Sequence, residues 1–284
     1  MADVVSPEVV REKTEPTYAD LSYGEHEQQV MDVWLAESET PTPLVLFIHG
    51  GGFRNGSKSN FPAEALHKFL DAEISLAALE YRFVQHKRLP AAHHDCRYAF
   101  QLIRSRAEEW NLDKRQVGAF GGSAGAQICM WLGFHDDMAN ANAEDPVERE
   151  STRLTCVATR GGQTTMDFDW WVKNIPGYEQ PHRDPRETFE AEKFREVVRD
   201  VSALSLISKG DPPIFMTYGM SPEDPVPDDS DKAQGWKVHH VNFGFALKKE
   251  MDALSIESHV VYPGIEAAYD SLEDFLIGQL TNDR

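Results

Sequence analysis

Apolar and polar positions alternate along the first part of the chain and then give way to continuous apolar runs. Residues 17–23 and 28–35 alternate on either side of Gly24, which predicts two antiparallel strands joined as an entry hairpin. Residues 43–48 form an apolar run without alternation, the pattern of a strand buried on both faces of a parallel sheet. The chain therefore enters a buried sheet after a short hairpin.

Further along the chain, segments with helical and strand patterns follow one another in turn. We expect helices at 61–72, 90–109, 123–133, 240–254 and 271–280, and further strands at 75–81, 116–120, 155–159, 212–218 and 258–262. Such alternation requires a mostly parallel sheet with helices on both faces. We therefore predict an α/β fold with an eight-stranded sheet.

One segment, residues 164–200, interrupts this alternation. It contains Asp-Phe-Asp-Trp-Trp at 167–171, several prolines and a charged stretch. We interpret residues 164–200 as an insertion, and we assign residues 1–163 and 201–284 to the core.

Charge and composition restrict the partners of the chain. Its 284 residues carry a formal net charge of −19, which repels phosphate backbones and anionic lipid, so nucleic acid is excluded as an expected partner. No run approaches the roughly 20 apolar residues that span a bilayer, and the chain does not open as a signal peptide does, so we expect no membrane insertion. We expect a cytoplasmic protein, or a secreted or periplasmic one if a signal peptide has been removed.

The three cysteines give no sign of a metal site or a disulfide scaffold. Cys96, Cys129 and Cys156 are widely spaced and form no C-x-x-C pair. The cysteines therefore give no reason to expect a metal, and the chemistry considered below requires neither a metal nor an organic cofactor.

A glycine-flanked serine is the first candidate for chemistry. Gly-Gly-Ser-Ala-Gly at 121–125 matches G-x-S-x-G and lies between a predicted strand and a predicted helix, where a nucleophile turn is found. Small neighbours allow the backbone to turn sharply, and the helix start directs backbone N–H groups at developing negative charge. Ser123 is therefore the candidate nucleophile.

A glycine run after the buried strand strengthens this hypothesis. His-Gly-Gly-Gly-Phe at 49–53 lacks the spacing of a phosphate-binding loop and is typical of the oxyanion loop of esterases. We expect the N–H groups of Gly51, Gly52 and Ala124 to hold an oxyanion, and His49 to order the loop.

With these motifs, the chain resembles the α/β-hydrolase superfamily, specifically the hormone-sensitive-lipase-like esterases and bacterial feruloyl-esterase-like relatives. The resemblance also rests on Tyr-Arg-Phe at 81–83 leading to Asp95, and on 201–205 running into 211–213. It implies the α/β-hydrolase fold, a cap over the site and a small carboxylic ester as the substrate.

The resemblance places a triad acid shortly after the seventh strand. Asp224 is the best match, with Glu223 and Asp228 as alternatives, although this stretch also has the composition of a solvated acidic loop. The acid would orient a histidine, which in turn would deprotonate Ser123.

The histidine itself is missing from its expected place. In the family pattern Tyr-Pro-Gly-x-x-His, the position of the histidine is occupied by Ala267 in this chain. His239 and His240 are the best substitutes, because they follow the Asp224 loop and precede the next helix. Loss of the base, natural or by deliberate substitution at position 267, remains an alternative.

Aromatic residues suggest where a substrate is held. Trp170 and Trp171 in the insertion, with Phe53 after the glycine run, are candidate substrate contacts, although the tryptophans would equally serve to attach the insertion to the core.

Two functions follow from this sequence. The first is a serine carboxylic-ester hydrolase that acts on small acyl or aryl esters, acylated carbohydrates among them, through an acyl-enzyme. The second is an impaired or inactive homologue that keeps the pocket and binds a small ligand. The pattern does not fix the oligomeric state.

Overall fold

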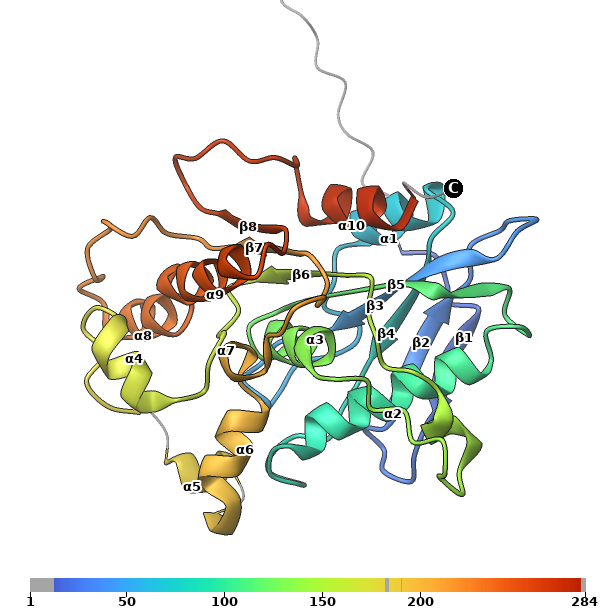
Figure 1. Cartoon of the computed structure of the whole chain (residues 1–284), viewed down its shortest axis with the longest axis horizontal. Helices are drawn as coiled ribbons and strands as arrows, with labels where there is room; N and C mark the ends of the chain where they lie inside the picture. Colours follow the sequence, from blue (N-terminus) through green and yellow to red (C-terminus); the bar gives the residue numbers. More distant parts are fainter. Residues whose placement is uncertain (1–12, 182–183, 190, 282–284) are drawn as a thin grey trace, which may run out of the picture.

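The computed structural model describes residues 13–181, 184–189 and 191–281. Its centre is one eight-stranded sheet in the order β1-β2-β4-β3-β5-β6-β7-β8 (Figure 1). The strands are β1 (Tyr18–Ser22), β2 (Val30–Trp34), β3 (Thr42–Ile48), β4 (Ser75–Leu79), β5 (Leu112–Gly122), β6 (Cys156–Arg160), β7 (Ile214–Thr217) and β8 (Ser258–Val261). β2 pairs antiparallel with β1 and with β4, and the other pairs are parallel. The predicted entry hairpin and mostly parallel sheet are confirmed.

Helices cover both faces of this sheet. α1 (Ala63–Asp71) and α10 (Leu272–Thr281) pack on one face, where they share a core with alternate residues of the central strands. α2 (Ala91–Ser105), α3 (Ala124–Phe134) and α9 (Asn242–Ala253) belong to the larger core on the other face. Every residue of β3 is buried, as its unbroken apolar sequence predicts.

The predicted insertion is helical. Residues 164–200 contain α4 (Phe168–Asn174), α5 (Pro185–Thr188), the 3₁₀ turn η2 (Ala191–Lys193) and α6 (Phe194–Asp200), and α7 (Ala203–Leu206) follows. A hydrogen bond from Leu89 N to Thr188 O attaches this segment to the start of α2. Within the described ranges, no helix is long and apolar enough to cross a membrane.

Several short elements have no predicted counterpart, among them the helices of the insertion, α7 and the two described next. One is the 3₁₀ turn η1 (Pro146–Arg149), and the other is α8 (Ser230–Val238). α8 buries only Ala233, so it lacks the apolar stripe by which a helix is recognised in a sequence. Its position decides the geometry of the site, because it ends directly before His239.

Candidate functional site

Ser123 occupies a strained turn between β5 and α3. Its backbone has φ 52° and ψ −118°, a conformation that non-glycine residues rarely adopt. The turn is held by its own backbone, since Ser123 N donates to Arg160 O at 2.9 Å and Gln127 N donates to Ser123 O at 3.0 Å. The sequence motif therefore forms the sharp turn that presents a serine hydroxyl at the end of a sheet.

Close packing explains the last glycine of this motif. A Cβ on Gly125 would overlap the carbonyl oxygen of Ile48 at the end of β3. Only glycine lets the start of α3 approach the neighbouring strand this closely.

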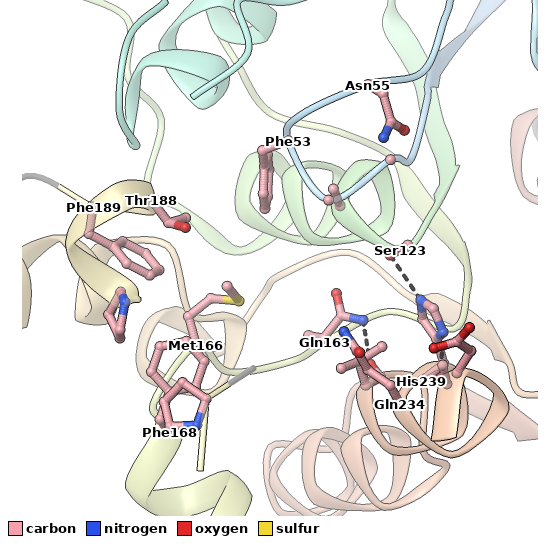
Figure 2. A pocket seen from close by; sticks show the side chains of 18 residues that line it. Phe53, Asn55, Ser123, Gln163, Met166, Phe168, Thr188, Phe189, Gln234 and His239 are labelled. Atoms are coloured by element: carbon pink, nitrogen blue, oxygen red, sulfur yellow. Dashed lines mark hydrogen bonds between the residues drawn. The ribbon is translucent and has the colours of Figure 1, made fainter. Parts of the chain in front are cut away.

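His239 is the side chain that contacts the serine. Its Nε2 lies 2.9 Å from Ser123 Oγ, and its Nδ1 lies 2.8 Å from the backbone oxygen of Gly235 (Figure 2). A carbonyl oxygen only accepts hydrogen bonds, so Nδ1 carries the proton. In the neutral imidazole, Nε2 then offers its lone pair to the serine hydroxyl, as a general base requires.

α8 holds this histidine in place. Asp229 caps the start of the helix by accepting from Lys232 N at 2.9 Å, and the helix ends one residue before His239. The amide of Gln163 donates to Val238 O and also to Gly161 O at 3.2 Å. The carbonyl groups at the end of a helix carry partial negative charge, so Gly235 O both orients the ring and favours its protonated form.

The environment of His239 sets its protonation. Burial lowers the pKa of His239 below its ordinary value of 6.5, and the hydrogen bond to Gly235 opposes this shift in part. The ring is therefore neutral at pH 7 and able to accept a proton.

His240 has a different environment from its neighbour. It is fully buried, its Nδ1 accepts from Asn242 N at 3.1 Å, and its ring lies 4.4 Å from that of Trp236. Of the two histidines that the sequence left open, the structure brings His239 to Ser123 and uses His240 in packing.

The predicted acid does not take part in this arrangement. Asp224 Oδ2 accepts from Ser221 N at 2.8 Å within the exposed loop after β7, and Gly235 O occupies the hydrogen-bonding position on His239 Nδ1. The expectation that Asp224 orients the histidine is therefore corrected, because a backbone carbonyl of α8 does so. Ala267 lies in the exposed stretch 263–268, beyond β8.

The glycine loop lies beside the serine. Gly51 and Gly52 have φ values of 112° and 60°, which direct the loop around the site, and they line one cavity together with Ser123 and Ala124. His49 orders this loop, since its Nδ1 lies 2.7 Å from Gly50 O and its Nε2 lies 3.0 Å from Glu80 Oε2. The three residues predicted as oxyanion donors thus lie along the same cavity as Ser123.

This cavity, called the first cavity below, lies between the glycine loop and the insertion. It measures about 640 Å³, and the side chains that line it include Phe53, Met166, Phe168, Thr188 and Phe189. Figure 2 shows these residues across the cavity from the Ser123–His239 pair. Phe53 therefore lines the same cavity as Ser123.

The two tryptophans of the insertion lie elsewhere. Trp171 is buried, and its Nε1 donates to Thr165 O at 2.8 Å. Trp170 stacks on Phe243 of α9 with ring centres 5.4 Å apart. Neither lines the cavity, so their prediction as substrate contacts is corrected: they attach α4 to the core.

Sequence reasoning missed two residues that support the site. Gln163 and Gly235 position His239 through α8. The sequence signal that could have located this helix is the capping Asp229 at its start, and the sequence gives no sign of Gln163. In the described part of the chain, no cluster of three or more His, Cys, Asp or Glu residues is arranged to hold a metal ion.

Comparison with known proteins identifies a matching family model and similar curated proteins. The BD-FAE family model matches residues 31–233, a range that ends before Gly235 and His239. An arylesterase of Saccharolobus solfataricus is 31% identical over 91 residues, which cover 31% of this chain and 29% of that protein. An ethyl acetate hydrolase of Pseudomonas putida is 25% identical over 209 residues, which cover 68% of this chain and 65% of that protein. The chain thus matches less than two thirds of the length of either curated relative.

Solved structures share the fold. A truncated carbohydrate esterase from gut microbiota superposes with a TM-score of 0.70 at 18% identity, over 95% of this chain and 100% of that one. An acetyl ester-xyloside bifunctional hydrolase from Caldicellulosiruptor lactoaceticus gives a TM-score of 0.62 at 22% identity, over 82% of this chain and 76% of that one. The predicted α/β-hydrolase fold and the resemblance to esterases are confirmed.

Proposed function

The chain belongs to the BD-FAE family, and we propose that it is a serine carboxylic-ester hydrolase whose general base is His239. Its similar proteins and structural neighbours carry the names of esterases and of an ester hydrolase. These names support a hydrolase that acts on esters. The acyl-enzyme mechanism and the choice of substrate are our inference from the site.

One observation carries this proposal. His239 donates from Nδ1 to Gly235 O and approaches Ser123 Oγ with Nε2, while Ser123 sits in the strained turn of a nucleophile. The pair has the orientation that a serine–histidine–acid triad produces, with a helix carbonyl in place of the carboxylate.

The acylation step follows from these contacts. His239 Nε2 takes the proton of Ser123 as Oγ attacks the carbonyl carbon of the ester. The negative charge that develops on the carbonyl oxygen is stabilised by the N–H groups of Gly51, Gly52 and Ala124. As the tetrahedral intermediate collapses, Nε2 returns the proton to the departing alcohol oxygen, and the acyl group stays on Ser123.

Deacylation repeats the sequence with water. His239 takes a proton from water as the hydroxide attacks the acyl carbon, and it then protonates Ser123 Oγ as the carboxylic acid leaves. A carbonyl carries only part of the charge of a carboxylate, so it stabilises the imidazolium less. We therefore expect a turnover number below that of an otherwise similar enzyme with a complete triad.

The cavity favours a small ester. Apolar and aromatic side chains line much of it, and the amides of Asn55, Gln163 and Gln234, together with Thr188 and Asp231, add polar groups. These residues suit a short acyl or aryl ester, and the amides provide hydrogen bonds for an acylated carbohydrate.

Labelling of the nucleophile tests the proposal. A fluorophosphonate should modify Ser123 of the native chain, identified by peptide mass, and p-nitrophenyl acetate should be hydrolysed. Both the labelling and the hydrolysis should disappear in the Ser123→Ala variant. Absence of labelling and of hydrolysis in the folded native chain would favour the alternative, a binding protein that has lost its base.

A further inference from the structure

A second cavity opens on the Ser123–His239 pair. It measures about 550 Å³, and Ser123, Gly235 and His239 line it as they line the first. The three predicted oxyanion donors Gly51, Gly52 and Ala124 line only the first cavity. The reacting atoms therefore lie between two separate spaces.

The walls of the second cavity are mainly apolar, with four aromatic side chains among glycines, and Arg160 and Glu273 also line it. Phe47 near the end of β3, Phe120 in β5 and Phe61 line one wall. The ring centre of Phe47 lies 5.0 Å from that of Phe61 and 5.1 Å from that of Phe120. Trp236 of α8 and Leu272 of α10 add further apolar surface. This lining suits an apolar group of about the size of an aromatic ring.

Glycines where the strands end keep this space open. β5 ends at Gly122, Gly161 directly follows β6, and Gly219 lies just after β7. All three glycines line the cavity. A Cβ built on Gly219 meets no atom within 4 Å, so the space beside it is free. The loop after β8, which contains Ala267, projects away from the sheet and does not line the cavity (Figure 1). Residues 262–271, which include position 267, therefore contribute nothing to the lining of this cavity.

We propose that the second cavity binds the apolar half of the ester, so that the two halves of the substrate lie in separate cavities on either side of Ser123. This inference rests on the proposed function, because the shared lining residues Ser123 and His239 define where the scissile bond lies. The substrate class that fits is an ester with one bulky apolar group, carried by either the alcohol or the acyl part.

Filling one cavity at a time tests this assignment. Gly219→Leu adds a side chain at the wall of the second cavity, and Thr188→Leu adds one at the wall of the first as its matched control. Two series of esters are compared: methyl, benzyl and naphthylmethyl acetates, in which the alcohol grows, and p-nitrophenyl acetate, butyrate and benzoate, in which the acyl group grows.

We expect Gly219→Leu to lower kcat/KM for the largest member of one series by on the order of tenfold or more relative to its smallest member. Thr188→Leu should leave that ratio close to the native value. The affected series identifies which half of the ester the second cavity holds. If Gly219→Leu leaves the ratios of both series at their native values, the proposal is wrong.

A binding measurement separates this inference from the proposed function. The Ser123→Ala variant of the whole chain is titrated calorimetrically with 2-naphthol, which needs no turnover, and the titration is repeated after Gly219→Leu is added. Binding that weakens by on the order of tenfold supports the cavity even if the native chain hydrolyses no ester. The native chain could instead hydrolyse esters while Gly219→Leu changes neither the kcat/KM ratios nor naphthol binding. In that case the proposed esterase function would stand, and the proposal for the second cavity would be wrong.

Discussion

At the residue scale, two adjacent histidines have different roles because the backbone turns between them. His239 points from the end of α8 toward Ser123, while His240 is buried against Trp236. Their order in the sequence gives no sign of this difference. It arises because α8 ends at Val238, which fixes the direction of the following side chain.

The role of Asp224 is open to a direct test. Because Asp224 bonds to Ser221 N and Gly235 O occupies His239 Nδ1, we expect Asp224→Asn to retain kcat/KM for p-nitrophenyl acetate within about threefold. Loss of a carboxylate that orients the base costs on the order of 10⁴-fold in a triad enzyme. A fall of that size in steady-state assays would show that Asp224 moves onto His239 during catalysis.

The pKa of His239 predicts the pH profile. Burial lowers this pKa, so the neutral, proton-accepting form persists below pH 6.5. The rate should rise with pH as the ring loses its proton, and kcat/KM should reach half its maximum below pH 6.5. A midpoint above 6.5 would indicate that another group, or a charged neighbour formed with substrate, controls the base.

At the scale of elements, α8 is the support on which the base depends. Gln163, in the segment after β6, donates to Val238 O and so fixes the end of the helix. We expect Gln163→Leu to lower kcat by about tenfold, because small displacements of a catalytic group have large effects on rate. The measurement is kcat with p-nitrophenyl acetate at saturation, with circular dichroism to establish that the variant folds. An unchanged kcat would mean that α8 holds His239 without this amide.

The elements show where sequence reasoning succeeds. Long, strongly patterned segments such as β3 and α3 were predicted to within a few residues, and the two glycine motifs placed Ser123 beside Gly51 and Gly52. These features are encoded locally, by burial on both faces and by backbone angles that favour glycine.

The rest of the site depends on contacts that are distant in the sequence. α8 buries one residue and shows no apolar period, so it was missed, and with it the carbonyl of Gly235 that replaces the acid. The tryptophans of α4 were open to either role, since an aromatic side chain serves a pocket or a core equally well. Only the packing against Phe243 decides for the core.

At the scale of the whole molecule, a buried histidine links stability to pH. His93 is fully buried and contacts Gln127 Oε1 through Nε2, while Gln127 donates to Val201 O. This orientation of the amide places the proton of His93 on Nε2 and leaves Nδ1 without a partner. Burial lowers the pKa of His93 to about 4.

The sign of the resulting pH dependence follows from this shift. The unfolded chain binds a proton at His93 below an ordinary pKa of about 6.5, whereas the native chain does so only near 4. The stabilisation from a neutral His93 is therefore present above pH 6.5 and is lost as the pH falls toward 4, on the order of 3 kcal/mol in all.

Urea unfolding at pH 7 and pH 4.5 measures this contribution. The free energy of unfolding of the native chain should fall more between these two values than that of His93→Gln, which has no group to titrate there. Carboxylates affect both proteins alike, so the difference isolates the histidine. Equal falls in the two proteins would contradict a buried neutral His93.

The central claim is that His239 serves as the base for Ser123, and hydrolysis of p-nitrophenyl acetate by matched variants tests it most directly. His239→Ala should lower kcat/KM by on the order of 10³-fold or more. His240→Asn, which retains a polar side chain beside Asn242, should stay within about tenfold of the native chain. An active His239→Ala variant, or a silent native chain that gains turnover only with Ala267→His, would contradict the account.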